Sequence, residues 1–149
     1  MQEQGFRGPQ VCKIVGITYR QLDYWARTDL VRPSVMDAAG SGTQRLYSFR
    51  DLLELKVIKQ MLDAGIALQS ARRAVESLRT FNKDLASAQI VIQGATVVLA
   101  ESDEQVMDLL RAGQGVLSVV LPVEPLQQNL TDAVQLTFDA VDAPRAASN

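Results

Sequence analysis

The sequence predicts an α+β protein with a mainly helical N-terminal half and a small β-β-α-β segment in its C-terminal half. Three observations lead to this class. Up to about residue 80, apolar residues recur at spacings of three and four between helix-capping residues. After that point, two short β-branched runs flank Gln93-Gly94, which is typical of a hairpin. The composition, 47% hydrophobic and 21% charged, is that of a globular protein that can bury a core.

Two short helices joined by a tight turn are predicted near the N-terminus. Pro9 suits the first turn of the first helix, and Gly16 suits its C-terminal cap. Thr18 is a good N-cap for a second helix over residues 19–27. Because so few residues separate the two helices, the pair has the form of a helix-turn-helix. In that motif the second helix enters the major groove of DNA.

A two-stranded wing is predicted next. Its strands are Val35-Met36 and residues 45–47, and a tip of small, turn-forming residues lies between them. Ser48 and Asp51 then form a capping-box pattern at the start of a third helix. A fourth helix is expected from about Leu68, where apolar spacings of three and four resume.

The C-terminal segment alternates between strand and helix patterns. The expected elements are strands at 90–92 and 96–99, a helix beginning near Ser102, a strand at 116–121 and a final helix around Leu126 to Val134. We therefore expect a DNA-binding domain at 8–79, a linker or short helix at 80–87, a C-terminal domain at 88–140 and a disordered tail at 141–149. Dimerisation and the binding of a small effector are the two roles open to the C-terminal domain.

Charge is distributed unequally along the chain. Residues 1–80 carry twelve basic and eight acidic side chains, a net charge of +4, whereas residues 81–149 carry three and nine, a net charge of −6. A basic half joined to an acidic half indicates that the first half meets a polyanion.

The rarer residue types argue against catalysis and metal binding. The chain has no histidine and one cysteine, Cys12, so it lacks the commonest general base and the ligands of a zinc site. We expect no enzyme activity, no cofactor and no metal. No apolar run is long enough to cross a membrane, and the N-terminus lacks the pattern of a signal peptide. A cytoplasmic location is the simplest interpretation.

The second helix carries side chains suited to reading DNA. Arg20 and Gln21 lie in its first turn, where Arg can bind guanine and Gln can bind adenine through two hydrogen bonds each. Tyr24, one turn further, can donate its hydroxyl to a phosphate. On the wing, strand alternation places Arg45 and Tyr47 on one face, toward DNA. The full set of expected DNA contacts is Thr18, Tyr19, Arg20, Gln21, Tyr24, Arg27, Thr43, Arg45 and Tyr47.

These motifs together resemble the DNA-binding domain of MerR-family transcription regulators. The resemblance rests on the runs ITYRQLDYWAR, LVRP and QRLYS and on the apolar residues of the two following helices, over about residues 8–79. The segments GITYRQLDYWARTDLV and GSGTQRLYSF are especially similar to those of an actinobacterial, mycobacterial-type branch of the MerR family. Arg45 and Tyr47 match the wing's Arg-x-Tyr pattern, whereas Asp23 stands where family members often have Arg.

The resemblance implies a homodimer that binds a pseudo-palindromic site in promoter DNA and acts through RNA polymerase. The family's long dimerising helix is not evident after Leu78, so we expect the C-terminal segment to dimerise instead. Phage excisionases have related winged helices, and an excisionase-like or architectural DNA-binding protein is the alternative.

Overall fold

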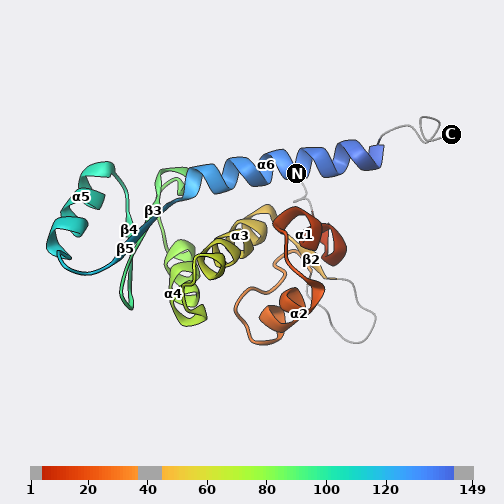
Figure 1. The fold of residues 1–149 in the computed structure, drawn as a ribbon. Helices are drawn as coiled ribbons and strands as arrows, with labels where there is room; N and C mark the ends of the chain where they lie inside the picture. The colour runs from red at the N-terminus through yellow and green to blue at the C-terminus, as the bar shows by residue number, and fades with distance from the viewer. Residues whose placement is uncertain (1–4, 37–44, 143–149) are drawn as a thin grey trace. The chain divides into compact units, whose positions relative to one another are not determined.

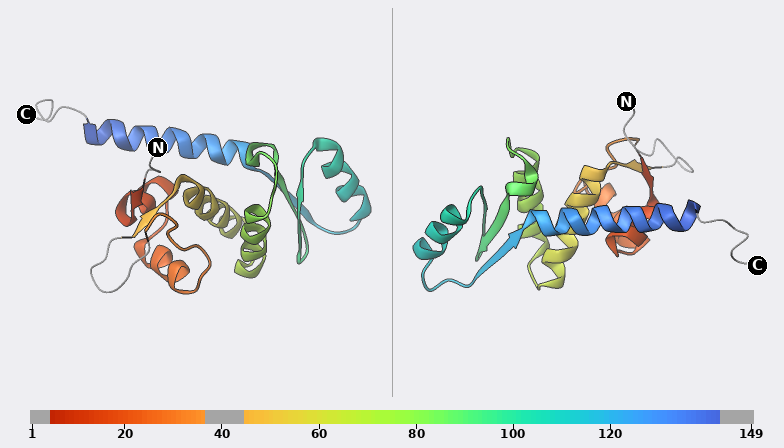
Figure 2. Two further views of the ribbon diagram at one scale, coloured as in Figure 1. Left: turned by 180° about the vertical axis from the view of Figure 1, so that it is seen from behind. Right: turned by 90° about the horizontal axis from the view of Figure 1, so that it is seen from above.

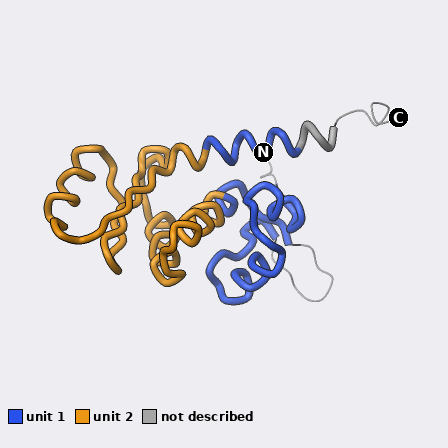
Figure 3. The backbone as a smooth tube through the Cα atoms, in the orientation of Figure 1, with its two compact units in different colours: residues 1–52, 128–149 blue, residues 53–127 orange. Residues whose placement is uncertain are grey.

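The computed structural model describes residues 5–36 and 45–142, and the side chains of 138–142 lie outside this description. The elements are β1 (Phe6–Arg7), α1 (Gly8–Val15), α2 (Tyr19–Arg27), β2 (Leu46–Tyr47), α3 (Phe49–Asp63), α4 (Leu68–Arg79), the 3-10 helix η1 (Leu85–Ser87), β3 (Gln89–Gln93), β4 (Thr96–Ala100), α5 (Asp103–Ala112), β5 (Ser118–Pro122) and α6 (Val123–Asp142) (Figure 1). The class is α+β, as the sequence predicts. The chain divides into two compact units, residues 1–52 with 128–149 and residues 53–127 (Figure 3).

The first unit contains the expected helix pair α1 and α2. Helix α1 ends where Gly16 adopts the left-handed conformation, with φ of 86°, and donates its N–H to the carbonyl of Cys12 at 2.8 Å. Helix α2 begins at the capping box formed by Thr18 and Gln21. The two helices contact each other. Their buried side chains are Val11, Ile14 and Val15 from α1 and Leu22, Trp25 and Ala26 from α2.

The base of the wing, which comprises residues 45–47 with β1 and Val35-Met36 and is called the wing base below, differs from the expected two-stranded ribbon. Strand β2 pairs antiparallel with β1, which the sequence did not predict, and Phe6 lies opposite Tyr47. The expected pairing of residues 35–36 with 45–47 is limited to one bridge between Met36 and Leu46. The expected tip, including Thr43, lies outside the described residues.

The second unit contains an antiparallel three-stranded sheet of order β4-β3-β5. The β3–β4 hairpin turns through two residues, because Gln93 pairs with Thr96 and Gly94 takes the φ of 58° that such turns require. The third strand begins at Ser118, later than the predicted Val116, and includes Pro122. Ile90 and Val91 on the central strand point to opposite faces of the sheet and are both fully buried, at 0% and 1% exposure.

Helices cover both faces of this sheet. Helix α5 contributes Val106 to a cluster with Val91 and Ala100, and α4 lies against β4. All views place α4 and α5 on opposite sides of the sheet (Figures 1 and 2). The Gln93 side chain donates to the carbonyl of Leu109 at 2.9 Å, which joins the end of β3 to α5. Both faces of the sheet are therefore covered within this unit.

The predicted final helix is α6, which extends from Val123 to Asp142. Its buried residues within the described side chains are Val123, Leu126, Leu130 and Thr137, spaced three, four and seven apart. It includes the first two positions of the expected tail, and residues 143–149 lie outside the described part of the chain. Among the described residues, no helix is long and apolar enough to span a membrane.

Candidate nucleic-acid interface

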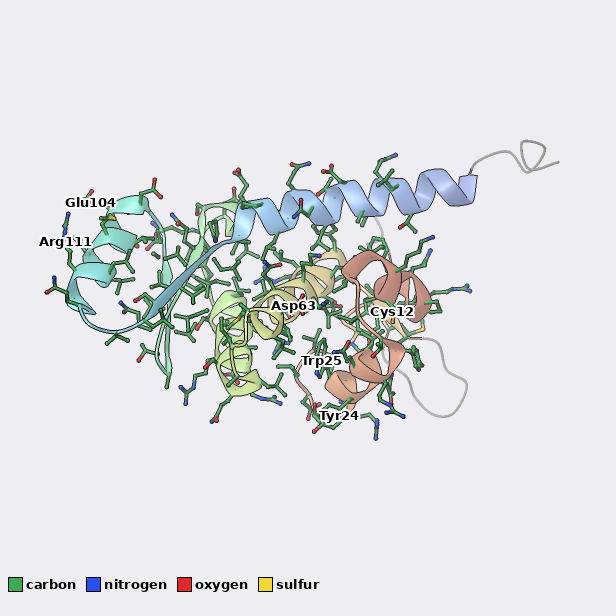
Figure 4. The ribbon with its side chains drawn as sticks, in the orientation of Figure 1. Cys12, Tyr24, Trp25, Asp63, Glu104 and Arg111 are labelled. Carbon is green, nitrogen blue, oxygen red and sulfur yellow. The ribbon has the colours of Figure 1, made fainter. Side chains whose placement is uncertain are left out.

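Helix α2 exposes one face and buries the other. Tyr19 is 59% exposed and Tyr24 is 51% exposed, whereas Trp25 is 4% exposed. Figure 4 shows Tyr24 on the outer side of α2 and Trp25 directed inward. Arg20 and Arg27 are also exposed on this helix. The exposed face therefore presents two aromatic hydroxyls and two guanidinium groups, which are the donors that DNA-binding helices use.

The first turn of α2 is fixed by its own capping box. The Thr18 hydroxyl oxygen accepts a hydrogen bond from the backbone N–H of Gln21 at 3.0 Å, and Gln21 Oε1 accepts from the backbone N–H of Thr18 at 3.0 Å. A two-bond contact with adenine needs both the oxygen and the nitrogen of the Gln21 amide. Because the Gln21 amide oxygen already accepts from the Thr18 N–H, a contact with adenine would have to share that oxygen with the cap.

Of the two residues of the wing base that were expected to contact DNA, Arg45 is partly exposed and Tyr47 is buried. Arg45 is 17% exposed along its side chain and donates from Nη1 to Asp23 on α2 at 2.8 Å. Tyr47 is 0% exposed, while Leu46 is partly exposed, so the predicted orientation of this strand is wrong. The reason is the pairing with β1, which places Tyr47 opposite the buried Phe6. A side chain without exposed surface does not reach DNA in this conformation.

Asp23 joins α2 to the wing base, a function that the sequence analysis missed. One carboxylate oxygen accepts from Arg45 at 2.8 Å and the other accepts from Arg27 Nε at 2.9 Å. The hydrogen bond from Arg45, and after it the charge of Arg27, lowers the pKa of Asp23 below its ordinary value. The carboxylate therefore stays ionised at neutral pH. The spacing of Asp23 and Arg27 was a visible signal for an ion pair, but nothing local indicated Arg45.

The described residues do not form a metal site, and their cysteine is not activated. They contain no cluster of three or more His, Cys, Asp or Glu side chains that could hold a metal ion. Cys12 is partly buried on α1, and burial raises the pKa of its thiol, which makes it less reactive. Within the part of the chain that the structure describes, the exposed face of α2 with Arg45 and Asp23 is the strongest candidate site.

Comparison with known proteins agrees with this geometry. The family described as MerR HTH family regulatory protein matches residues 6–78. The chain is 55% identical over 118 residues to uncharacterized HTH-type transcriptional regulators of Mycobacterium bovis and Mycobacterium tuberculosis. The aligned part is 78% of this chain and 52% of those proteins, so the chain spans about half the length of the curated relatives it matches. An alignment of 118 residues also extends beyond residues 6–78.

Proposed function

Because residues 6–78 are a helix-turn-helix domain of the MerR family, we propose that this protein is a sequence-specific, double-stranded-DNA-binding regulator of transcription. The observation that carries the proposal is the exposed face of α2, with Tyr19, Arg20, Tyr24 and Arg27 beside the guanidinium of Arg45. Helices of this kind read base edges from their N-terminal turn.

The residues of α2 divide into two groups by their place on the helix. Arg20, in the first turn, is the reader of a base edge, and guanine is the base that Arg prefers. Tyr24 and Arg27 lie further along the helix, where they contact phosphates and fix the register without reading sequence. Arg45 adds a further cationic group from the wing base. Thr18 and Gln21 hold the first turn in shape.

We further propose that the protein acts as a homodimer on a pseudo-palindromic promoter site and influences RNA polymerase there, in the cytoplasm. A helix-turn-helix dimer places two recognition helices on half-sites one turn of DNA apart. The C-terminal segment supports this role because it exposes apolar side chains that a partner would cover, among them Met107 at 48%, Val116 at 50% and Leu117 at 87%.

Selection from random duplex DNA tests the proposal. The expected result is enrichment of one sequence made of two related, inverted half-sites. Sedimentation of the intact protein at the same concentration should give a dimer. Absence of any enriched sequence would contradict sequence-specific binding, and a single half-site bound by a monomer would contradict the dimer. Mapping of bound sites in the genome separates promoters from the attachment sites that an excisionase-like protein would occupy.

Replacement of Arg20 by alanine is expected to relax specificity at one base pair of each half-site. Loss of a two-bond contact to a base removes about 1–3 kcal/mol of discrimination at that pair and little at the others. Binding of duplexes carrying single base changes measures this pattern. Lys83→Ala is the control, because it also removes one positive charge and Lys83 is 66% exposed, outside α2 and outside the apolar residues proposed to dimerise. Equal losses on every duplex would assign Arg20 to a phosphate instead.

A further inference from the structure

Asp23 is an acidic residue on a surface that otherwise presents cations to DNA. We propose that Asp23 determines specificity: it holds Arg45 and Arg27 in place for the target site and weakens binding to unrelated DNA. This inference rests on the proposed DNA-binding function and assigns a role to a residue inside that same interface. Its basis is the arrangement of three charged groups from two elements.

The two carboxylate oxygens of Asp23 serve two different arginines. Oδ1 accepts from Arg45 Nη1 at 2.8 Å, and Oδ2 accepts from Arg27 Nε at 2.9 Å. The Asp23 side chain is 30% exposed and that of Arg27 is 65% exposed, so this group lies at the surface. One carboxylate therefore fixes the direction of a guanidinium on the recognition helix and of another on the wing base.

Arg45 depends strongly on this contact. Its side chain is only 17% exposed, and its Nε is buried without a hydrogen-bond partner among the described residues. A mostly buried guanidinium that lost Asp23 would have to find a new partner or turn toward solvent. Asp23 is thus a positioning residue for Arg45. This arrangement prepares Arg45 for a fixed geometry on DNA rather than for any nearby phosphate.

The same negative charge acts differently on matched and unmatched DNA. Binding to unrelated DNA comes almost entirely from attraction between cations and phosphates, so a carboxylate within the interface weakens it directly. Binding to the target site also draws on base contacts, which require correctly oriented side chains. Asp23 orients the arginines and reduces the general attraction to phosphates. It therefore increases the ratio of the affinity for the target site to the affinity for unrelated DNA.

Replacement of Asp23 by asparagine is the test, with affinities measured over a range of salt concentrations. The probes are the duplex enriched by selection and a duplex of unrelated sequence. On the unrelated duplex we expect tighter binding by a factor of several and a salt slope steeper by about 0.9, the contribution of one phosphate contact. On the enriched duplex we expect unchanged or weaker binding. The ratio of the two affinities should fall by about tenfold, which is the ratio that 1.4 kcal/mol represents.

Asp29→Asn is the matched control because it removes the same charge from the same unit. Asp29 is 72% exposed, pairs with Arg32 and has a φ of 64°, a conformation that asparagine tolerates. A second variant, Asp23→Glu, keeps the charge and should bind the unrelated duplex as weakly as the native protein does.

Three results would overturn the inference. One is an equal loss of affinity by Asp23→Asn on both duplexes with no change of salt slope, which would mark Asp23 as a purely structural link. The second is an equal gain on unrelated DNA for Asp29→Asn, and the third is the same gain for Asp23→Glu. Failure of the proposed function is a different outcome, because selection would then yield no enriched duplex at all.

Discussion

Replacement of Asp51 by alanine is expected to lower the free energy of unfolding by about 3 kcal/mol. The Oδ2 atom of Asp51 accepts three hydrogen bonds, from the N–H and hydroxyl of Ser34 at 2.8 and 2.7 Å and from the N–H of Ser48 at 2.9 Å. Asp51 is 6% exposed, so water does not readily replace these bonds. The variant loses one of the two hydrogen bonds of the capping box, because the Ser48 hydroxyl still accepts from the backbone N–H of residue 51, and it leaves three donors without this acceptor.

Urea unfolding of the intact protein measures this effect. Asp63→Ala is the control. Asp63 lies on the same helix, but its side chain is 58% exposed and forms an ion pair with Lys59, one helical turn earlier. A pair of that kind contributes about 0.3–0.5 kcal/mol. Asp51→Asn keeps one oxygen acceptor and should fall between the two. Equal stability of the Asp51→Ala and Asp63→Ala variants would show that the contacts of Asp51 do not stabilise the fold.

The comparison of Ser48 and Ser34 illustrates which parts of the fold the sequence predicts. The pattern of Ser48 and Asp51 spans one helical turn, and the structure confirms it as a capping box. The contact of Ser34 with Asp51 joins residues 17 apart, and no local pattern indicates it. Helix α2 was predicted with its bounds because its cap, apolar spacing and last turn are all contained within ten residues.

The prediction for β2 failed for the same physical reason. Side chains of a strand alternate between its two faces, but three residues are too few to show which face is buried. The sequence therefore cannot decide whether Leu46 or Tyr47 faces the interior. The phase is set by β1, a strand of two residues near the N-terminus that gives no periodic signal. The exposed face of α2 was therefore predictable, whereas the wing base required the tertiary structure.

Asp23 shows that contacts between residues far apart in the sequence also affect the interpretation of function. In the sequence it is an acidic residue where members of the MerR family often have arginine, and a carboxylate by itself repels phosphate. Its contact with Arg45 spans 22 residues and changes that interpretation, because the charge is balanced and used to orient two cations. The sheet order β4-β3-β5 is another long-range property, since the sequence indicated the strands and the hairpin but not the place of β5.

Replacement of Arg79 by alanine is expected to destabilise the second unit by about 3 kcal/mol, and more than replacement of its partner Glu54 by glutamine. The two side chains join α4 to α3: Arg79 Nη2 donates to Glu54 Oε1 at 2.9 Å, and its Nε lies 3.3 Å from each carboxylate oxygen. The Glu54 side chain is 6% exposed and the Arg79 side chain is 41% exposed.

This difference in burial is the reason that Arg79→Ala should cost more stability than Glu54→Gln. Removal of Arg79 takes a charge-assisted contact from a carboxylate that water barely reaches, and breaking a buried pair in this way costs several kcal/mol. Loss of the charge on Glu54 leaves a guanidinium that is already partly hydrated, so Glu54→Gln should cost about 1 kcal/mol. Urea unfolding of both variants and of Arg111→Ala, whose pair with Asp108 is 73% and 66% exposed, measures the three effects. Equal costs for Arg79→Ala and Glu54→Gln would mean that the buried carboxylate does not depend on Arg79.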